Sequence, residues 1–304
     1  MNSFAHNLVG ERHAVRVSGL LRQSCAGRLT PSRTRGNGLN IVPAGTPAYL
    51  ADSLSVVARG IVYSSADLDV AIDQRVRHLV FDETGRAELQ TLLATLPTTQ
   101  FQEAALRNVL QSSQDIEDWR VGEALAEAFL SDHCACFFPW PSGRDVRNPS
   151  ASPAGTDLVG FEVRDGVTRF AFGEVKTSQQ ESWPPQVMYG RHGLINQLET
   201  LRDSVDAKNW LVRYLGLHSI GKAWEQRLKA AAERYLRDSN DVALFGFLVR
   251  DVDPNVADLD ARARALGTTC PAATTVSLRA VYLPSQHISL LVAKINGPSS
   301  TSQS

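Results

Sequence analysis

The sequence predicts an α/β protein with a mixed sheet flanked by helices. Two strand-like stretches, 157–163 and 168–176, are joined by Arg164-Asp165-Gly166, a turn signal that favours a hairpin. A third stretch, 242–249, is nearly all apolar, as expected for a strand that is covered on both faces. From 116 to 250 the expected order is helix, strand, strand, strand, helix, strand, which is typical of an α/β fold.

The elements follow from hydrophobic spacing and from the residues that interrupt it. In the first 100 residues, strands are expected at 15–21 and 61–63 and helices at 68–80 and 86–96. Further helices are expected at 101–110, 116–130, 194–205, 224–236 and 256–266. Further strands are expected at 134–140, 157–163, 168–176, 242–249, 276–283 and 288–295. Pro141 ends the strand before it, and a polar loop is expected at 144–154.

Three regions follow from this pattern. Residues 1–100 carry no catalytic motif and are expected to form an N-terminal accessory region, with partner binding as a candidate role. Residues 101–297 contain the clearest α/β signal and are expected to form the catalytic domain. The tail 298–304 is rich in Ser and polar residues and is expected to be disordered.

Composition excludes several classes of protein. The 304 residues carry a net charge of −1, which does not exclude nucleic-acid binding because a local basic groove suffices. The apolar stretches fall short of the roughly 20 residues that a membrane-spanning helix needs, and no secretory signal is evident. We therefore expect a soluble, cytoplasmic protein without a membrane partner. No Gly-x-x-x-x-Gly-Lys-Ser/Thr loop is present, so this chain is not expected to bind ATP.

Two segments contain the candidate active-site residues. They are the segment around Asp157 and the run Phe172-Gly173-Glu174-Val175-Lys176-Thr177. Glu174 and Lys176 are two residues apart on a strand, so their side chains leave the same face. They break the apolar pattern of that strand, and such breaks concentrate at functional sites. The hairpin brings Asp157 towards Glu174. Two close carboxylates repel unless a cation holds them, and oxygen ligands favour Mg²⁺, with Mn²⁺ as an alternative.

These residues suit hydrolysis of a phosphodiester. A Mg²⁺ ion held by Asp157 and Glu174, with the backbone carbonyl of Val175 as a further candidate ligand, polarises the phosphate and acidifies a bound water. Lys176 orients that water or helps to deprotonate it, and stabilises the negative charge of the transition state. The alternative interpretation is an exposed ion pair between Glu174 and Lys176, which is common on surface strands.

These motifs resemble those of the PD-(D/E)XK, or restriction-endonuclease-like, nuclease superfamily over roughly residues 116–250. The resemblance implies an αβββαβ core in which Asp157 lies on the second strand and Glu174 and Lys176 lie on the third. The chain departs from the pattern at Thr156, where members often have proline.

The same resemblance implies two further site residues. Many members add a metal-binding glutamate on the first core helix, for which Glu123 and Glu127 are the candidates. Members often carry a catalytic glutamine on the helix after the Glu-x-Lys motif, and Gln197 fits that place. The alternatives are a solvated acidic helix face for the glutamates and an ordinary surface position for Gln197.

A narrower resemblance rests on three runs, Trp119-Arg120-Val121-Gly122-Glu123, Phe138-Pro139-Trp140-Pro141 and the segment 188–199. Together they resemble the nuclease subunit of the Hachiman anti-phage defence system. This resemblance implies DNA as substrate, a helicase subunit as partner and a role in antiviral defence.

Candidate nucleic-acid contacts lie on either side of the Glu-x-Lys motif. Arg191 and His192 stand in Gly-Arg-His-Gly before a helix, where free backbone N–H groups form an anion site suited to a DNA phosphate. Arg144 and Arg147 lie in the loop before Asp157 and are candidates for contacts with the nucleic-acid backbone. The alternatives are a capping loop and ordinary surface charges.

The sequence is therefore compatible with three candidate functions. The first is a Mg²⁺-dependent DNase that works with a helicase, and the second is a stand-alone endonuclease of the restriction or transposition type. The third is a non-catalytic nucleic-acid-binding module on the same fold. The intact set of Asp, Glu and Lys argues against the third, and the lack of an evident sequence-reading module argues against the second.

Overall fold

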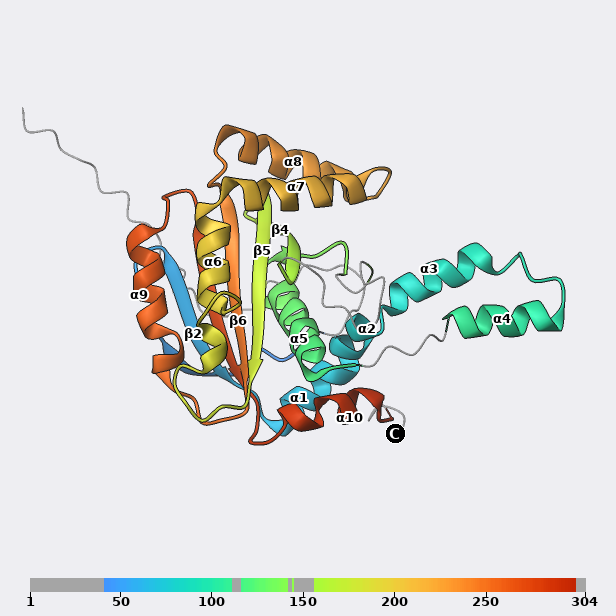
Figure 1. The fold of residues 1–304 in the computed structure, drawn as a ribbon, viewed down its shortest axis with the longest axis horizontal. Coiled ribbons are helices and arrows are strands. Elements are labelled where there is room, and N and C mark those ends of the chain that lie inside the picture. The colour runs from blue at the N-terminus through green and yellow to red at the C-terminus, as the bar shows by residue number, and fades with distance from the viewer. Residues whose placement is uncertain (1–40, 111–115, 142–143, 145–155, 299–304) are drawn as a thin grey trace, which may run out of the picture. The chain divides into compact units, whose positions relative to one another are not determined.

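A computed structural model describes residues 41–110, 116–141, 144 and 156–298. It confirms the predicted class, an α/β fold with a mixed sheet (Figure 1). The seven strands are ordered β1-β2-β7-β6-β5-β4-β3. The four central strands β2, β7, β6 and β5 are parallel, and each outer strand pairs antiparallel with its neighbour. The strands are β1 Thr46–Leu50, β2 Val56–Val62, β3 Cys136–Phe137, β4 Leu158–Arg164, β5 Val167–Ser178, β6 Val242–Arg250 and β7 Thr275–Tyr282.

Helices cover both faces of this sheet, each over its own hydrophobic cluster. One face carries α1 Ser65–Ala71, the π-helical turn η1 Ile72–Val76, α2 Arg77–Val80, α5 Asp118–His133 and α10 Leu291–Asn296. The other face carries α6 Leu194–Asp203, α8 Glu225–Arg237 and α9 Asp260–Thr269, with α7 Val205–Ser219 packed on α6 and α8. The remaining elements are α3 Glu83–Leu93, α4 Gln100–Leu110 and the 3₁₀ turns η3 Gln186–Met188, η4 Val256–Asp258 and η5 Ile288–Leu290. No helix within these described ranges is long and apolar enough to cross a membrane.

The hairpin that was expected around the Glu-x-Lys motif is present. Asp165 and Gly166 have φ angles of 52° and 77°, the left-handed conformation that a tight hairpin turn requires. The turn fixes the register so that Leu158 lies opposite Gly173. β6, which pairs with the other side of β5, is buried at every position, as its apolar sequence predicts. The motif therefore lies on a strand held from both sides.

Two expected strands differ from the structure. The stretch 288–295 is not a strand but η5 followed by α10, because Ile288, Leu291 and Ile295 recur at helical spacing and are all buried. The stretch 134–140 contains only the two-residue strand β3. Ala135 has a positive φ angle, and Pro139 and Pro141 have no N–H group to donate, so pairing stops early.

Some expectations fall on residues outside the described ranges. These are the strand at 15–21, the loop 144–154 apart from Arg144, and the tail apart from Pro298. The region expected to be accessory contributes β1 and β2 to the sheet, beyond β7.

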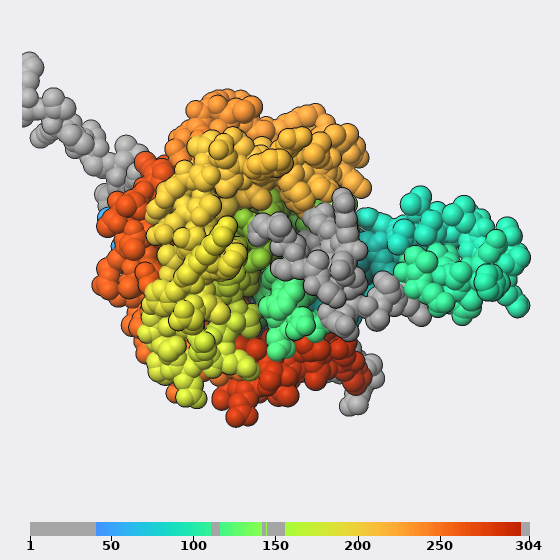
Figure 2. All heavy atoms as spheres, viewed as in Figure 1, coloured from blue at the N-terminus to red at the C-terminus, as the bar shows by residue number. Residues whose placement is uncertain are grey.

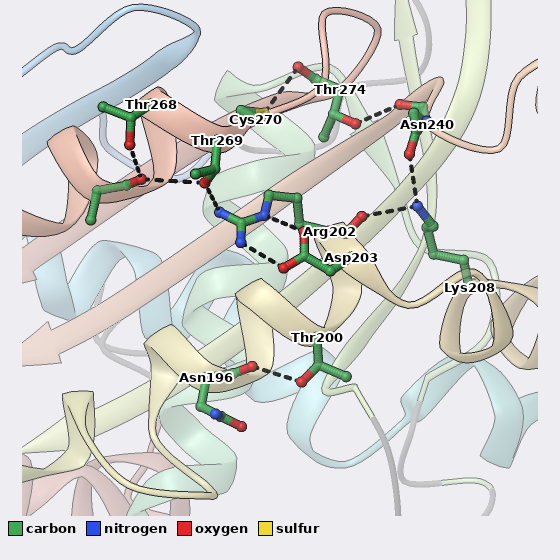
Figure 3. Close-up of polar contacts among 11 residues, drawn as sticks. Asn196, Thr200, Arg202, Asp203, Lys208, Asn240, Thr268, Thr269, Cys270 and Thr274 are labelled. Atoms are coloured by element: carbon green, nitrogen blue, oxygen red, sulfur yellow. Dashed lines mark hydrogen bonds and ion pairs between the residues drawn. The ribbon is translucent and has the colours of Figure 1, made fainter.

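A polar network holds the junction between α6 and α7 (Figure 3). The buried Arg202 guanidinium donates two hydrogen bonds of 2.6 Å to the Asp203 carboxylate and one of 2.5 Å to Thr269 Oγ1. The buried Lys208 ammonium donates to the carbonyl oxygen of Arg202 at 3.1 Å and to Asn240 Oδ1 at 3.3 Å. Because Lys208 bonds a carbonyl that the end of α6 leaves without a helical partner, the network fixes α6 against α9 and the start of β6.

Candidate active site

Asp157 lies immediately before the first residue of β4, next to the point on β5 where pairing with β4 stops. β4 begins at Leu158 opposite Gly173, so the backbone of β5 beyond Gly173 has no partner from β4. The Asp157 side chain occupies this position, and its Oδ2 accepts a hydrogen bond of 2.8 Å from the Val175 N–H. The hairpin register therefore anchors Asp157 directly beside the Glu-x-Lys motif.

Glu174 and Lys176 share the β5 face that also carries the buried Phe170 and Phe172. Glu174 is only 1% exposed, so the interpretation as an exposed surface ion pair is wrong. The Lys176 ammonium donates a hydrogen bond of 2.7 Å to Glu174 Oε1. Glu174 Oε2 is buried, and no donor among the described residues reaches it. A buried carboxylate oxygen without a donor is costly unless a proton or a cation satisfies it.

The carboxyl group of Asp157 lies within hydrogen-bonding reach of both Glu174 and Glu123. Burial, followed by the negative charge of Asp157, raises the pKa of Glu174 to about 8, although Lys176 opposes the shift. Burial and the same charge raise the pKa of Glu123 to about 7, against the effect of Arg120. Burial also raises the pKa of Asp157, although the Val175 N–H and Lys176 lower it. Without a cation, Glu174 and Glu123 therefore retain protons near neutral pH.

The structure distinguishes between the two glutamates of α5. Glu123 faces Asp157 and Lys176, and its Oε2 accepts a hydrogen bond of 3.0 Å from Arg120 Nη1. Glu127 lies one turn further along the helix, where its charged neighbours are Arg120, Arg75, Asp82 and Arg144. Burial raises the pKa of Glu127 to about 7. Of the two candidates, Glu123 is the one that joins the carboxyl cluster.

The close approach of α5 to β5 places Glu123 in this cluster. A Cβ atom added at Gly122 would lie 2.2 Å from Thr177 Oγ1, so only glycine permits the observed contact. Thr177 Oγ1 is itself buried without a hydrogen-bond partner among the described residues. Spacing alone did not single out Gly122, Thr177 or Arg120. Arg120 could have been found because it stands three residues before Glu123, on the same helix face.

We expect Gly122→Ala to lower the free energy of unfolding by about 1–3 kcal/mol, the usual cost of inserting a methyl group into a packed core. It should also lower any activity of the site, because α5 must shift to relieve the contact with Thr177. Chemical denaturation measures the first effect. Gly216→Ala on α7 is the matched control, since a Cβ there meets nothing within 4 Å and the change should stabilise the helix. Equal stability of the two variants would contradict the packing argument.

The other residues expected at the site lie on its α6 side or in the loop before β4. α6 packs on β5, and Gln197 in its first turns has a buried Oε1 without a hydrogen-bond partner in the described ranges. Arg191 and His192 are exposed just before the N-cap of α6, Gly193. Arg144 instead bonds Asp82, with its Nε and Nη2 at 2.6 and 2.9 Å from the carboxylate oxygens, while Arg147 lies outside the described residues.

A divalent cation fits the chemistry of this cluster. The donor set is carboxylate, with the backbone carbonyl of Val175 on the same strand segment, and Glu174 Oε2 has no donor. Within the described ranges, no three His, Cys, Asp or Glu side chains already form a group that could hold a metal ion. Mg²⁺ does not require such a group, because proteins usually bind it through one or two carboxylates while it keeps several waters.

No protein-family model matches the sequence, and no curated protein matches it.

Proposed function

We propose that this chain is a metal-dependent nuclease that hydrolyses phosphodiester bonds of DNA. The observation that carries the proposal is the cluster of Asp157, Glu174 and Lys176, with a buried oxygen of Glu174 that lacks a donor. The chain order α5, β3, β4, β5, α6 and then, after α7 and α8, β6 is compatible with the restriction-endonuclease-like core that the resemblance implies. We propose that these elements form a restriction-endonuclease-like core.

Each residue has a role in the proposed reaction. Asp157 and Glu174 would hold Mg²⁺ or Mn²⁺, with Glu123 and the carbonyl of Val175 as additional ligands. The bound ion would supply charge neutralisation at the phosphate and acidification of a water. The Lys176 ammonium lies 2.7 Å from Glu174 Oε1, where it can hold the attacking water and stabilise developing negative charge. Gln197, on the helix packed against β5, would position the water or the phosphate.

Substrate binding is assigned to exposed basic side chains just before α6. Arg191 and His192 precede a helix N-terminus, where backbone N–H groups and the helix dipole favour a phosphate. Arg144 stays a candidate contact with the nucleic-acid backbone. To bind a phosphate, its guanidinium would have to share or give up its hydrogen bonds to Asp82.

The proposal is tested by incubating the purified chain with Mg²⁺ and equal amounts of single- and double-stranded DNA and RNA. Wild-type protein should cut DNA, and Asp157→Asn, which keeps the side-chain size and removes the charge, should not. Cleavage by the Asp157→Asn variant at the wild-type rate would contradict the proposal, and cleavage confined to RNA would correct the substrate.

A helicase partner and a role in anti-phage defence are further proposals, and they rest on the Hachiman resemblance. The same assay tests them when it is repeated with the product of the gene adjacent to this chain's own gene, with and without ATP. Co-elution and ATP-dependent cleavage would support the partner. Cleavage of one defined sequence by the lone chain would favour the stand-alone endonuclease.

A further inference from the structure

The two helices α3 and α4 form a hairpin without a core of its own. They pack against each other, and α3 also packs on α2 (Figure 1). Neither helix contains a buried residue. Each has 11 residues, a length at which an isolated helix is marginal in water. Packing within the chain therefore accounts for little of the stability of this hairpin.

Several large apolar side chains of the hairpin are exposed. The hairpin is drawn in teal in Figure 2. Phe101 is 83% exposed and Leu92 is 72% exposed. Exposed apolar residues are ordinary when they are scattered, but a contiguous group marks an interaction surface. The hairpin surface is defined by the exposed apolar residues Leu89, Leu92, Leu96, Phe101, Ala105 and Val109.

Several of these residues keep helical spacing. Leu89 and Leu92 lie three residues apart on α3, and Leu96 lies in the turn that follows the helix. Phe101, Ala105 and Val109 recur every four residues and form a stripe along α4. Each of the two short helices therefore carries exposed apolar side chains, as in half of a four-helix bundle, whose missing half is another helical pair.

Hydrogen bonds at the start of α3 fix the base of the hairpin, so the hairpin surface is already ordered before a partner binds. Asp82 is the N-cap of α3 and accepts a hydrogen bond of 3.1 Å from the Gly85 N–H. The same carboxylate accepts two hydrogen bonds from Arg144, whose guanidinium also lies 5.0 Å from the centre of the Trp140 ring. Ordering a segment before binding lowers the entropic cost of association.

We propose that the hairpin surface is the dimer interface of this chain, where the α3–α4 pair of one copy packs against that of a second copy. The charges around the hairpin surface are mixed, with glutamates at 83, 88 and 103 and arginines at 86 and 107. A polyanion or an anionic membrane would select a predominantly basic surface. A surface with both signs can be complementary to itself, as a twofold interface requires.

The apolar area is sufficient for such a dimer. Exposed Leu and Phe side chains of this size offer on the order of 100 Å² each, so two copies would bury about 1,000 Å² from the apolar side chains alone. Flanking polar residues would bring the total into the range of a specific interface, about 1,200–2,000 Å². This inference does not depend on the proposed nuclease activity.

The test measures the mass of the full chain in solution by light scattering over a range of low micromolar concentrations. Wild-type protein should have twice the mass of one chain. Leu92→Glu and Phe101→Glu should each give a single-chain mass at the same concentrations, with at least a tenfold higher dissociation constant. Both positions are exposed, and glutamate is a good helix former, so unfolding should not accompany the change.

Leu236→Glu on α8 is the matched control, because Leu236 is 83% exposed and lies outside the hairpin. It should remain a dimer. A wild-type chain that stays monomeric would overturn the proposal, and so would a dimer that survives both hairpin substitutions. If the hairpin amides gain protection from hydrogen exchange only when another protein is added, the surface belongs to that protein and the proposed dimer is wrong.

Discussion

Glu174→Gln is expected to lower the rate of DNA cleavage by about 10³-fold or more while leaving the fold intact. Removing one group that stabilises transition-state charge commonly costs about 10²–10³-fold. Here the substitution also removes a proposed ligand of the ion on which the reaction depends. Glutamine retains the size of the side chain, so no cavity forms. Single-turnover cleavage and a thermal melt of the same preparation measure the two effects.

The stability of this variant distinguishes a functional site from a structural ion pair. The pKa of Glu174 is raised to about 8 from 4.5, so the buried carboxylate is less stable in its charged form than an exposed one. Replacing it with a neutral amide should therefore leave the melting temperature unchanged or raise it at pH 8. A structural salt bridge would instead make the variant less stable.

Glu127→Gln is the matched control for both measurements. Glu127 is also buried with a pKa raised to about 7, but its charged neighbours do not include Asp157 or Lys176. The Glu127→Gln variant should change the melting temperature but should have little effect on the rate of DNA cleavage. Equal loss of cleavage in both variants would mean that Glu174 acts only through the general stability of the chain.

Local sequence patterns were sufficient to predict the hairpin that carries Asp157 and Glu174. The turn at Asp165 and Gly166 and the nearly continuous apolar run 242–249 of β6 are properties of short segments, and both are present. The burial of Glu174 could not be predicted in the same way. It depends on β6 and α6, which come later in the chain, and on the register that ends β4 pairing at Leu158.

The errors arose where tertiary packing outweighed local preference. The stretch from Ile288 to Ile295 is rich in β-branched and apolar residues, yet it is helical because one helical stripe fills the core beside α5. α7 was not expected, because its apolar residues occur on more than one face and Trp210 and Leu217 are exposed. The choice between Glu123 and Glu127 required the distance between helix and sheet, which is set by Gly122 and Thr177.

Removal of divalent metal is expected to stop cleavage completely, and Mg²⁺ or Mn²⁺ should restore it. Ca²⁺ should support DNA binding better than turnover, because it accepts looser geometry and more ligands than Mg²⁺. Binding should also stabilise the folded chain, by about 2.7 kcal/mol when the free ion is at 100 times its dissociation constant. Cleavage assays with a chelator and thermal melts with added Mg²⁺ measure these effects.

The stabilisation by Mg²⁺ should depend on pH in a direction set by the carboxyl cluster. Without metal, the folded chain holds protons on Glu174 and Glu123 up to about pH 8 and pH 7, whereas the unfolded chain releases them near pH 4.5. Because the folded state binds more protons in this window, these two groups make the metal-free protein less stable as pH rises from about 4.5 to 8. Metal must displace the same protons, so its apparent affinity should rise over that range, by up to about tenfold per pH unit for each proton released. The Mg²⁺-induced shift in melting temperature should therefore be small at pH 6 and large at pH 8, and absent in Glu174→Gln. A shift that is independent of pH, or that survives in Glu174→Gln, would mean that the ion binds elsewhere.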